Sequence, residues 1–205
     1  ALAAVVTAGL LPGKLTASAP YTRRFRTAAR AVAALPAPAL ALLADRGVNG
    51  FDSWTPSLAN GTALDQPRLY ADDRGSNVFA LLDRFPDRNA FRVVMTPSLR
   101  APSAVRGVPV TVVRGAAVDL GVEIRAPRER AFAYLVDAAH ETSRRPASGL
   151  AVWRVTAASL QRATGQLALG VDVARGRRHS RWEVRVPYRR VGDTDVELLL
   201  PARGY

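Results

Sequence analysis

Short stretches of alternating apolar and polar residues fill the second half of the chain. The alternation is clearest in AVDLGVEI (117–124), QLALGVDV (166–173) and RWEVRV (181–186). Successive side chains of a β-strand point to opposite faces, so each stretch predicts a strand with one apolar face. The residues expected on these faces are Val118, Leu120, Val122, Ile124, Leu167, Leu169, Val171, Val173, Trp182, Val184 and Val186.

Four further runs in this half read as strands: VTVV from Val110, FAYLV from Phe132, LAVWRV from Leu150 and DVELLL from Asp195. About seven strands at this spacing, separated by turns, predict an antiparallel β-sandwich over residues 107–205. The polar face of each strand is expected where an antiparallel sheet meets water.

The segment from Arg68 to Thr96 has a different pattern. A strand-like RLYA is followed by a polar group at residues 72–77, then by NVFALLDRF, which predicts a helix that Pro86 ends. FRVVM then reads as a second strand. This order is that of a β-α-β crossover. We therefore expect an α+β protein, with a long loop and a small α/β unit at 48–106 followed by the sandwich-like domain.

Residues 1–47 are predicted to hold an apolar start and helices. The first eleven residues are apolar, but about twenty are needed to cross a bilayer. An Ala-rich run from Thr22 predicts a helix that ends at Pro36, and Pro38 is expected to open a second short helix that stops at Gly47. These elements could lie beside a membrane, with the helix's arginines on lipid headgroups, or they could belong to a globular fold. With Met95 as the only methionine and an abrupt end after a strand-like run, the chain is expected to be a fragment of a longer protein.

Composition adds charge to this picture. The formal net charge is +12, and Lys14 is the only lysine, so arginine carries nearly all of the positive charge. Guanidinium groups favour phosphates, acidic polymers or anionic lipid surfaces, although a GC-rich genome would give the same arginine content. The chain has no cysteine and two histidines, which excludes thiolate chemistry and argues against a histidine-rich metal site.

The first group of candidate site residues lies around the crossover. Asp72 and Asp73 end its first strand, at the edge where open α/β sheets place ligands, and Arg74 follows them. One carboxylate could bind a metal or a sugar hydroxyl, or these residues could serve only to turn the chain and cap the helix. Arg88, in the turn after the helix, could contact a ligand or form a local salt bridge.

The second group is the arginine-rich run ARGRRHSRW, which predicts a hairpin tip. Its residues Arg175, Arg177, Arg178 and Arg181 could contact a polyanion or phosphate, or could be solvated turn residues. Interleaved aromatic residues are missing, so nucleic acid is not an expected partner. Trp153 and Trp182 lie in strand-like runs and are expected to fill the core.

Familiar catalytic motifs are missing from the sequence. It has no glycine-rich dinucleotide or phosphate loop, no Gly-x-Ser-x-Gly elbow and no paired zinc-ligating histidines. We expect no cofactor and no metal, and we assign no catalytic residue.

The segment LYADDRGSNVFALLDRFPDRNAFRVV resembles a stretch beyond the last membrane helices of polytopic glycosyltransferases of the dolichyl-phosphate-mannose type and their prokaryotic relatives. The shared elements are an Asp-Arg-Gly turn, here at 73–75, and a Pro-Asp-Arg turn, here at 86–88. In that family, acidic residues on loops near the first membrane helices transfer the sugar. The resemblance therefore implies that the catalytic residues lie outside this chain.

Three hypotheses follow. The chain could be a non-catalytic, extracytoplasmic accessory or acceptor-binding region of a membrane-embedded glycosyltransferase with a lipid-linked sugar donor. It could instead be a free-standing binding module for an acidic glycan or other polyanion, or a soluble enzyme that uses Asp72 or Asp73. The sequence Asn60-Gly61-Thr62 is an acceptor sequon for N-glycosylation, which favours an extracytoplasmic location.

Overall fold

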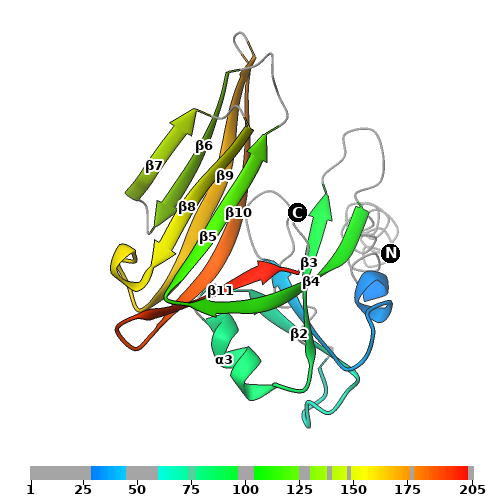
Figure 1. The fold of residues 1–205 in the computed structure, drawn as a ribbon. Helices are drawn as coiled ribbons and strands as arrows, with labels where there is room; N and C mark the ends of the chain where they lie inside the picture. Colours follow the sequence, from blue (N-terminus) through cyan, green and yellow to red (C-terminus); the bar gives the residue numbers. More distant parts are fainter. Residues whose placement is uncertain are drawn as a thin grey trace, which may run out of the picture. The chain divides into compact units, whose positions relative to one another are not determined.

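The structure is a computed structural model that describes residues 29–44, 60–73, 75, 77–96, 104–124, 130–137, 140–146, 149–175 and 178–202 (Figure 1). The chain forms two compact units. The first takes in Ala1–Asp73 and Phe85–Pro109, and the second takes in Arg74–Arg84 and Val110–Tyr205. The apolar start at residues 1–11 and the predicted helix before residue 29 lie outside the described residues.

A small sheet with a parallel centre forms the first unit. Its strands, in the order β2-β1-β3-β4, are β2 (Arg68–Asp73), β1 (Ala39–Ala44), β3 (Asn89–Thr96) and the first half of β4 (Ala104–Gly115). β1 pairs in parallel with both β2 and β3, and β4 pairs antiparallel with β3. One face of this sheet packs against a helical turn at 29–33 through a cluster that comprises Val32, Leu35, Ala39, Ala41, Leu43, Phe91 and Val93.

The second short helix expected after Pro38 is wrong, because ALALLA forms strand β1. Alanine and leucine favour helices, but a central parallel strand is buried on both faces and reads as a continuous apolar run. Residues 39–43 are at most 2% exposed, which fits that position. The end of the first predicted helix is confirmed, since the helical turn closes before Pro36.

The order strand, helix, strand expected for Arg68 to Thr96 is confirmed, with α3 (Asn77–Arg84) between β2 and β3. The two strands are not neighbours, however, because β1 lies between them. The strand that completes the parallel sheet is therefore the segment for which sequence patterning predicted a helix.

Asn60 closes the outer edge of β2. Its side-chain amide donates to the carbonyl oxygen of Tyr70 at 2.6 Å and accepts from the Tyr70 amide at 2.8 Å. These are the two bonds that a neighbouring strand would make, so a side chain takes the place of a strand at this edge.

The second unit is a β-sandwich, as the alternating pattern predicted. Its larger sheet is antiparallel, in the order β4-β11-β10-β9-β6-β7. The smaller sheet is the pair β5-β8, which Figure 1 shows in front of β9 and β10. The strands are β5 (Ala117–Ile124), β6 (Arg130–Asp137), β7 (His140–Pro146), β8 (Gly149–Thr156), β9 (Thr164–Arg175), β10 (Arg178–Val191) and β11 (Asp195–Pro201), with a short 3-10 helix η1 (Ala157–Ser159) after β8.

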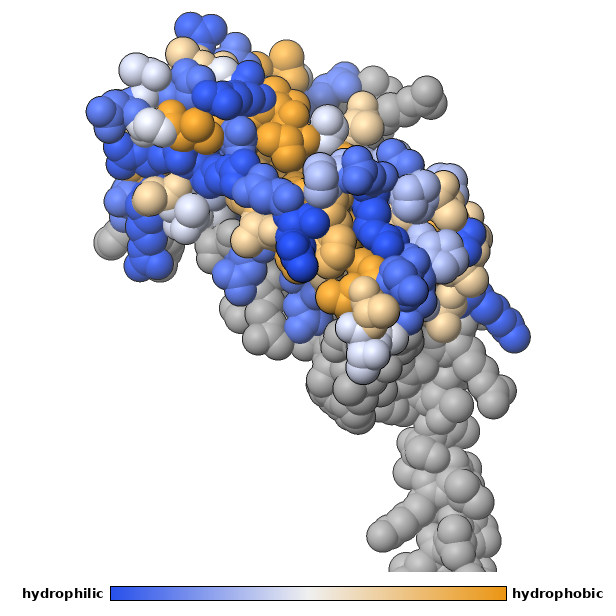
Figure 2. All heavy atoms as spheres, turned by 90° about the horizontal axis from the view of Figure 1, so that it is seen from below, coloured by the Kyte–Doolittle hydropathy of each residue, from blue (hydrophilic) through white to orange (hydrophobic). Residues whose placement is uncertain are grey.

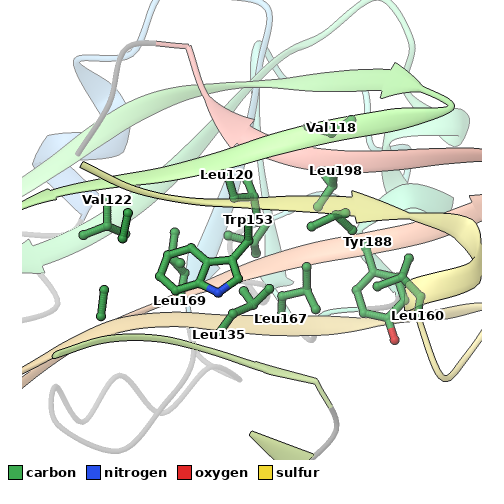
Figure 3. Close-up of a cluster of buried hydrophobic side chains, with 14 of the residues drawn as sticks. Val118, Leu120, Val122, Leu135, Trp153, Leu160, Leu167, Leu169, Tyr188 and Leu198 are labelled. Atoms are coloured by element: carbon green, nitrogen blue, oxygen red, sulfur yellow. The ribbon is translucent and has the colours of Figure 1, made fainter. Parts of the chain in front are cut away.

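The core of the sandwich lies between its two sheets (Figure 3). Trp153 of β8 is 5% exposed and lies among leucines from both sheets, as expected for a core tryptophan. The apolar faces predicted for β5 and β9 are confirmed by the burial of Val118, Leu120, Val122, Leu167, Leu169 and Val171.

Trp182 does not fill the core, contrary to expectation. It lies on the same face of β10 as Val184 and the buried Val186, but Trp182 itself is 49% exposed. Alternation along a strand therefore predicted the correct face but not whether another element covers that face at each position.

Helix α3 is attached to the larger sheet of the second unit by Arg189 of β10. Its guanidinium donates to both carboxylate oxygens of Asp83 and also to Glu197, and it lies 5.0 Å from the ring centre of Phe79. The hydrogen bond from Arg189 lowers the pKa of the Asp83 carboxyl. This bidentate pair holds the C-terminal half of α3 in place.

Candidate functional site

The outer face of the large sheet carries the best-defined cluster of polar side chains. Its foundation is Tyr134 of β6, which is 5% exposed and lies across Gly170 of β9, its cross-strand partner. A Cβ atom on Gly170 would lie 2.2 Å from the Tyr134 hydroxyl oxygen, so only glycine leaves room for the ring. The sheet therefore fixes the orientation of Tyr134.

Arg181 of β10 covers the tyrosine. Its guanidinium carbon lies 4.6 Å from the ring centre, and its Nε donates to the Tyr134 hydroxyl at 2.5 Å. The hydroxyl in turn donates to Glu183 Oε2 at 3.0 Å, and Arg181 Nη2 donates to the same oxygen at 2.9 Å. These contacts form a closed triangle of Tyr134, Arg181 and Glu183 that holds the guanidinium over the tyrosine ring.

The electrostatics of this cluster follow from its geometry. Burial raises the pKa of Tyr134, so the phenol stays neutral. The hydrogen bond to the tyrosine raises the pKa of Arg181. Arg185 approaches the other oxygen of Glu183 at 3.5 Å, so one carboxylate is flanked by two guanidinium groups. A further carboxylate, that of Asp172 on β9, belongs to the residue opposite Arg181 in the strand register.

The side chain of Arg181 is 62% exposed despite its contacts. Guanidinium groups present five N–H donors, and the contacts with Tyr134 and Glu183 use those on Nε and Nη2. Arg181 can therefore also donate to a phosphate or carboxylate that approaches from solvent.

The hairpin expected around the arginine run is confirmed, because β9 and β10 pair up to Arg175 opposite Arg178. The side chains of Arg175 and Arg178 lie outside the described residues, as does all of Arg177. Of the four arginines predicted to contact a polyanion, the structure thus describes the side chain of Arg181.

The two adjacent aspartates of the crossover point to opposite faces of β2. Asp73 is buried and forms an ion pair with Arg92 of β3, with Asp73 Oδ2 at 2.7 Å from Arg92 Nη2 and about 5% of either side chain exposed. Asp72 is partly buried on the other face. Strand alternation separates the carboxylates, so they do not form a joint site. Arg74 lies outside the described residues.

Arg88 stabilises a turn of the first unit. It donates to the carbonyl oxygens of Gln66 at 2.7 Å and Leu64 at 3.2 Å, and its guanidinium lies 5.8 Å from the ring centre of Phe85. Within the described residues, the hydrogen bonds of Arg88 go to backbone carbonyls. Asp73 and Arg88 thus both bond to other residues of the first unit.

Sequence patterning missed a buried polar site at one end of the sandwich core. Asp137 of β6 is 1% exposed; its Oδ1 accepts from the Tyr188 hydroxyl at 3.0 Å, and its Oδ2 accepts from the amide of Gln161 at 3.0 Å. Tyr188 lies across Gly165, just as Tyr134 lies across Gly170. A tyrosine whose cross-strand partner is glycine is the signal that could have revealed both sites, but it requires the strand register.

The described residues contain no group of three or more metal-ligating side chains. None of the helices described is long and apolar enough to cross a membrane. Hydrophilic residues cover most of the described surface visible in Figure 2, with apolar residues between them.

The fold defines an α+β protein with a β-sandwich and an arginine-bearing outer sheet face. Residues 54–200 match the family described as Domain of unknown function (DUF7846), and the chain belongs to this family. No curated protein and no solved structure matches the chain.

Proposed function

We propose that this chain is a non-catalytic acceptor-binding region of a membrane-embedded glycosyltransferase that uses a lipid-linked sugar donor, on the extracytoplasmic face of the membrane. The observation that carries the proposal is the position of Arg181. Tyr134 and Glu183 hold its guanidinium in place on an outer sheet face while its side chain stays 62% exposed. The resemblance of residues 69–94 to the transferase family supplies the enzymatic context.

A fixed arginine on the outer face of a sheet suits a glycan or a phosphate. Binding normally costs about 0.5–1.5 kcal/mol for each flexible side chain that becomes ordered, and a guanidinium already held in place avoids most of that cost. An extended glycan can lie along strands, with its carboxylates or the phosphate of its lipid carrier bonded to the guanidinium. The region would thus bind the acceptor while the reaction takes place elsewhere in the enzyme.

The experiment uses membranes that contain the intact transferase and measures two reactions. One is the transfer of sugar to the acceptor, and the other is the slow hydrolysis of the lipid-linked donor without acceptor. We expect R181Q to raise KM for the acceptor about tenfold, since a charge-assisted hydrogen bond contributes about 1.5–3 kcal/mol, and to leave donor hydrolysis unchanged.

R154Q is the matched control, because Arg154 is an exposed arginine in an ion pair with Asp119 on the β5-β8 sheet. It should change neither reaction. An unchanged acceptor KM in R181Q, or an equal loss of both reactions, contradicts the proposal.

The second candidate is a free-standing binding module for an acidic glycan or other polyanion, which the net charge of +12 favours. Purified chain would then bind an acidic glycan such as heparin, and the affinity would fall steeply with rising salt as counterions are released. Binding to a neutral polymer of equal length is the control. Equal binding to both polymers at low salt would eliminate this candidate.

A further inference from the structure

One side of β10 is paired along only part of its length. β9 pairs with β10 without interruption from Arg178 to Arg189, whereas β11 pairs on the other side only from Tyr188 to Val191. Among the strands that the structure describes, none pairs on that side between Arg178 and Pro187. Pro187 has no N–H to donate, which explains why the ladder with β11 ends there.

The direction of the backbone groups along this edge follows from one hydrogen bond. The amide of Arg190 donates to the carbonyl of Ala163, on the side of β9. Since both polar groups of a residue in an antiparallel strand point to the same side and alternate along the chain, even-numbered residues of β10 face β9. Odd-numbered residues 181, 183 and 185 direct their N–H and C=O groups toward the open edge.

The side chains along the edge carry a second pattern. Arg181, Glu183 and Arg185 alternate in charge on the outer face, while Trp182, Val184 and Val186 form an apolar row on the other. Trp182 is 49% exposed at this edge. Charges on an edge strand normally prevent unspecific pairing, but an alternating row is complementary to itself in selected registers.

Antiparallel pairing of two copies of β10 must place odd residues opposite odd residues. If the two-fold axis passes through Glu183 or Arg185, that residue lies opposite the same residue of the partner subunit, and like charges meet. If Val184 lies opposite its own copy, Glu183 meets the partner subunit's Arg185 on both sides of the axis, and Trp182 meets the partner subunit's Val186. This register satisfies the charges on one face and pairs apolar side chains on the other.

A register centred on Trp182 also pairs opposite charges, Arg181 with the partner's Glu183. It would, however, set Val184 opposite the partner's Ser180 and Val186 opposite the partner's Arg178, which mixes apolar and polar side chains in one row. The register centred on Val184 is therefore the better match.

We propose that the chain forms a two-fold homodimer in which β10 pairs antiparallel with β10 of a second copy, centred on Val184. The dimer joins the two larger sheets edge to edge and covers part of each Trp182. The dimer and the proposed function share Glu183, but the dimer needs no ligand on the exposed donors of Arg181, so the two proposals can be tested separately.

Cysteine crosslinking tests the register directly, because the chain has no cysteine of its own. At a pair that is not hydrogen-bonded, opposing Cα atoms lie about 4.5 Å apart, within the range of disulfides. We expect the full chain with V184C to form a disulfide-linked dimer within minutes under mild oxidation. V112C, at a half-exposed position on β4, is the control and should crosslink at least tenfold more slowly. Equal rates, or fast crosslinking of W182C in place of V184C, overturn the proposal.

Charge exchange provides the second test. Sedimentation of the unmodified chain at tens of micromolar should give twice the chain mass of 22.0 kDa. E183R and R185E should each be monomeric, because each sets like charges opposite one another, and an equimolar mixture of the two should regain the dimer. Circular dichroism confirms that each variant is folded. A monomeric unmodified chain, or two variants that both remain dimeric, overturns the proposal.

Discussion

The hydroxyl of Tyr188 donates a hydrogen bond to Asp137 Oδ1 over 3.0 Å, between two residues that are at most 1% exposed. Burial, followed by the hydrogen bond and charge of Asp137, raises the pKa of Tyr188 from 10.0 to about 12. The fold therefore strongly favours the neutral phenol.

This contact makes the free energy of unfolding depend on alkaline pH. The phenol has a higher pKa in the folded state, so its contribution is complete below pH 10 and is lost as pH rises toward about 12. We expect Y188F to lower the free energy of unfolding at pH 7 by about 1–3 kcal/mol, since Asp137 loses a buried donor. Between pH 10 and 12 the variant should lose less stability than the unmodified chain, as measured by urea unfolding. Identical alkaline slopes would contradict this assignment.

The Asp73 and Arg92 pair should show the energetics of a buried ion pair. R92M leaves the Asp73 carboxylate without its guanidinium partner and should lower the free energy of unfolding by about 3–5 kcal/mol. The double variant D73N/R92M should lose less than the sum of the two single variants, because it leaves no uncompensated charge. Urea unfolding of all four proteins measures the coupling.

The exposed pair of Arg154 and Asp119 is the matched control for this cycle. Its Nε and Oδ1 atoms are 3.0 Å apart, but 71% and 50% of the two side chains are exposed. R154M should therefore cost less than about 1 kcal/mol. Equal costs for the two arginines would show that burial does not strengthen the pair in the first unit.

Gly75 should resist substitution for two separable reasons. Its φ of 75° lies in the left-handed region, and a Cβ atom would lie 2.6 Å from Cγ and Cδ of Gln166. We expect G75A to cost about 1–2 kcal/mol for the backbone alone and more for the clash. In G75A/Q166A the clash is removed and the backbone cost remains, so the double variant should recover only the stability lost to the clash. Thermal unfolding measures this recovery.

Gly192 isolates the backbone part. Its φ is 64°, and a Cβ atom would meet nothing within 4 Å. G192A should therefore lower the free energy of unfolding of the unmodified chain by about as much as G75A lowers that of the Q166A variant. A clearly larger loss in the double variant would mean that Gln166 is not the side chain that excludes a larger residue at position 75.

Strands with strict alternation could be predicted from the sequence because one face of each meets the core. Strands β5 and β9 are examples, with Leu120 and Leu169 at the centre of the sandwich. β1 could not be predicted, because a strand buried on both faces has no alternation and its alanines and leucines favour a helix. β7, HETSRRP, has almost no apolar residues, and its pairing with β6 alone identifies it as a strand.

The candidate site was predictable only in part. Arg181 was singled out by its arginine-rich surroundings, but Tyr134, which orients it together with the nearby Glu183, lies on β6 and approaches it only through the strand register. Likewise, Asp73 was singled out by its place at a strand end, whereas its partner Arg92 follows nineteen positions later within an apolar strand. Pairings between distant segments decide what these charges do.

Asn60 presents a competition between folding and chemistry. The nitrogen that would carry an N-linked glycan is Nδ2, and this atom donates to the Tyr70 carbonyl oxygen at 2.6 Å. In any compartment that attaches such glycans, the enzyme that glycosylates asparagine must therefore reach Asn60 before this side chain bonds to β2. The fraction of chains glycosylated at Asn60 would then depend on how long the newly made chain stays unfolded, and a fast-folding chain would remain unglycosylated there.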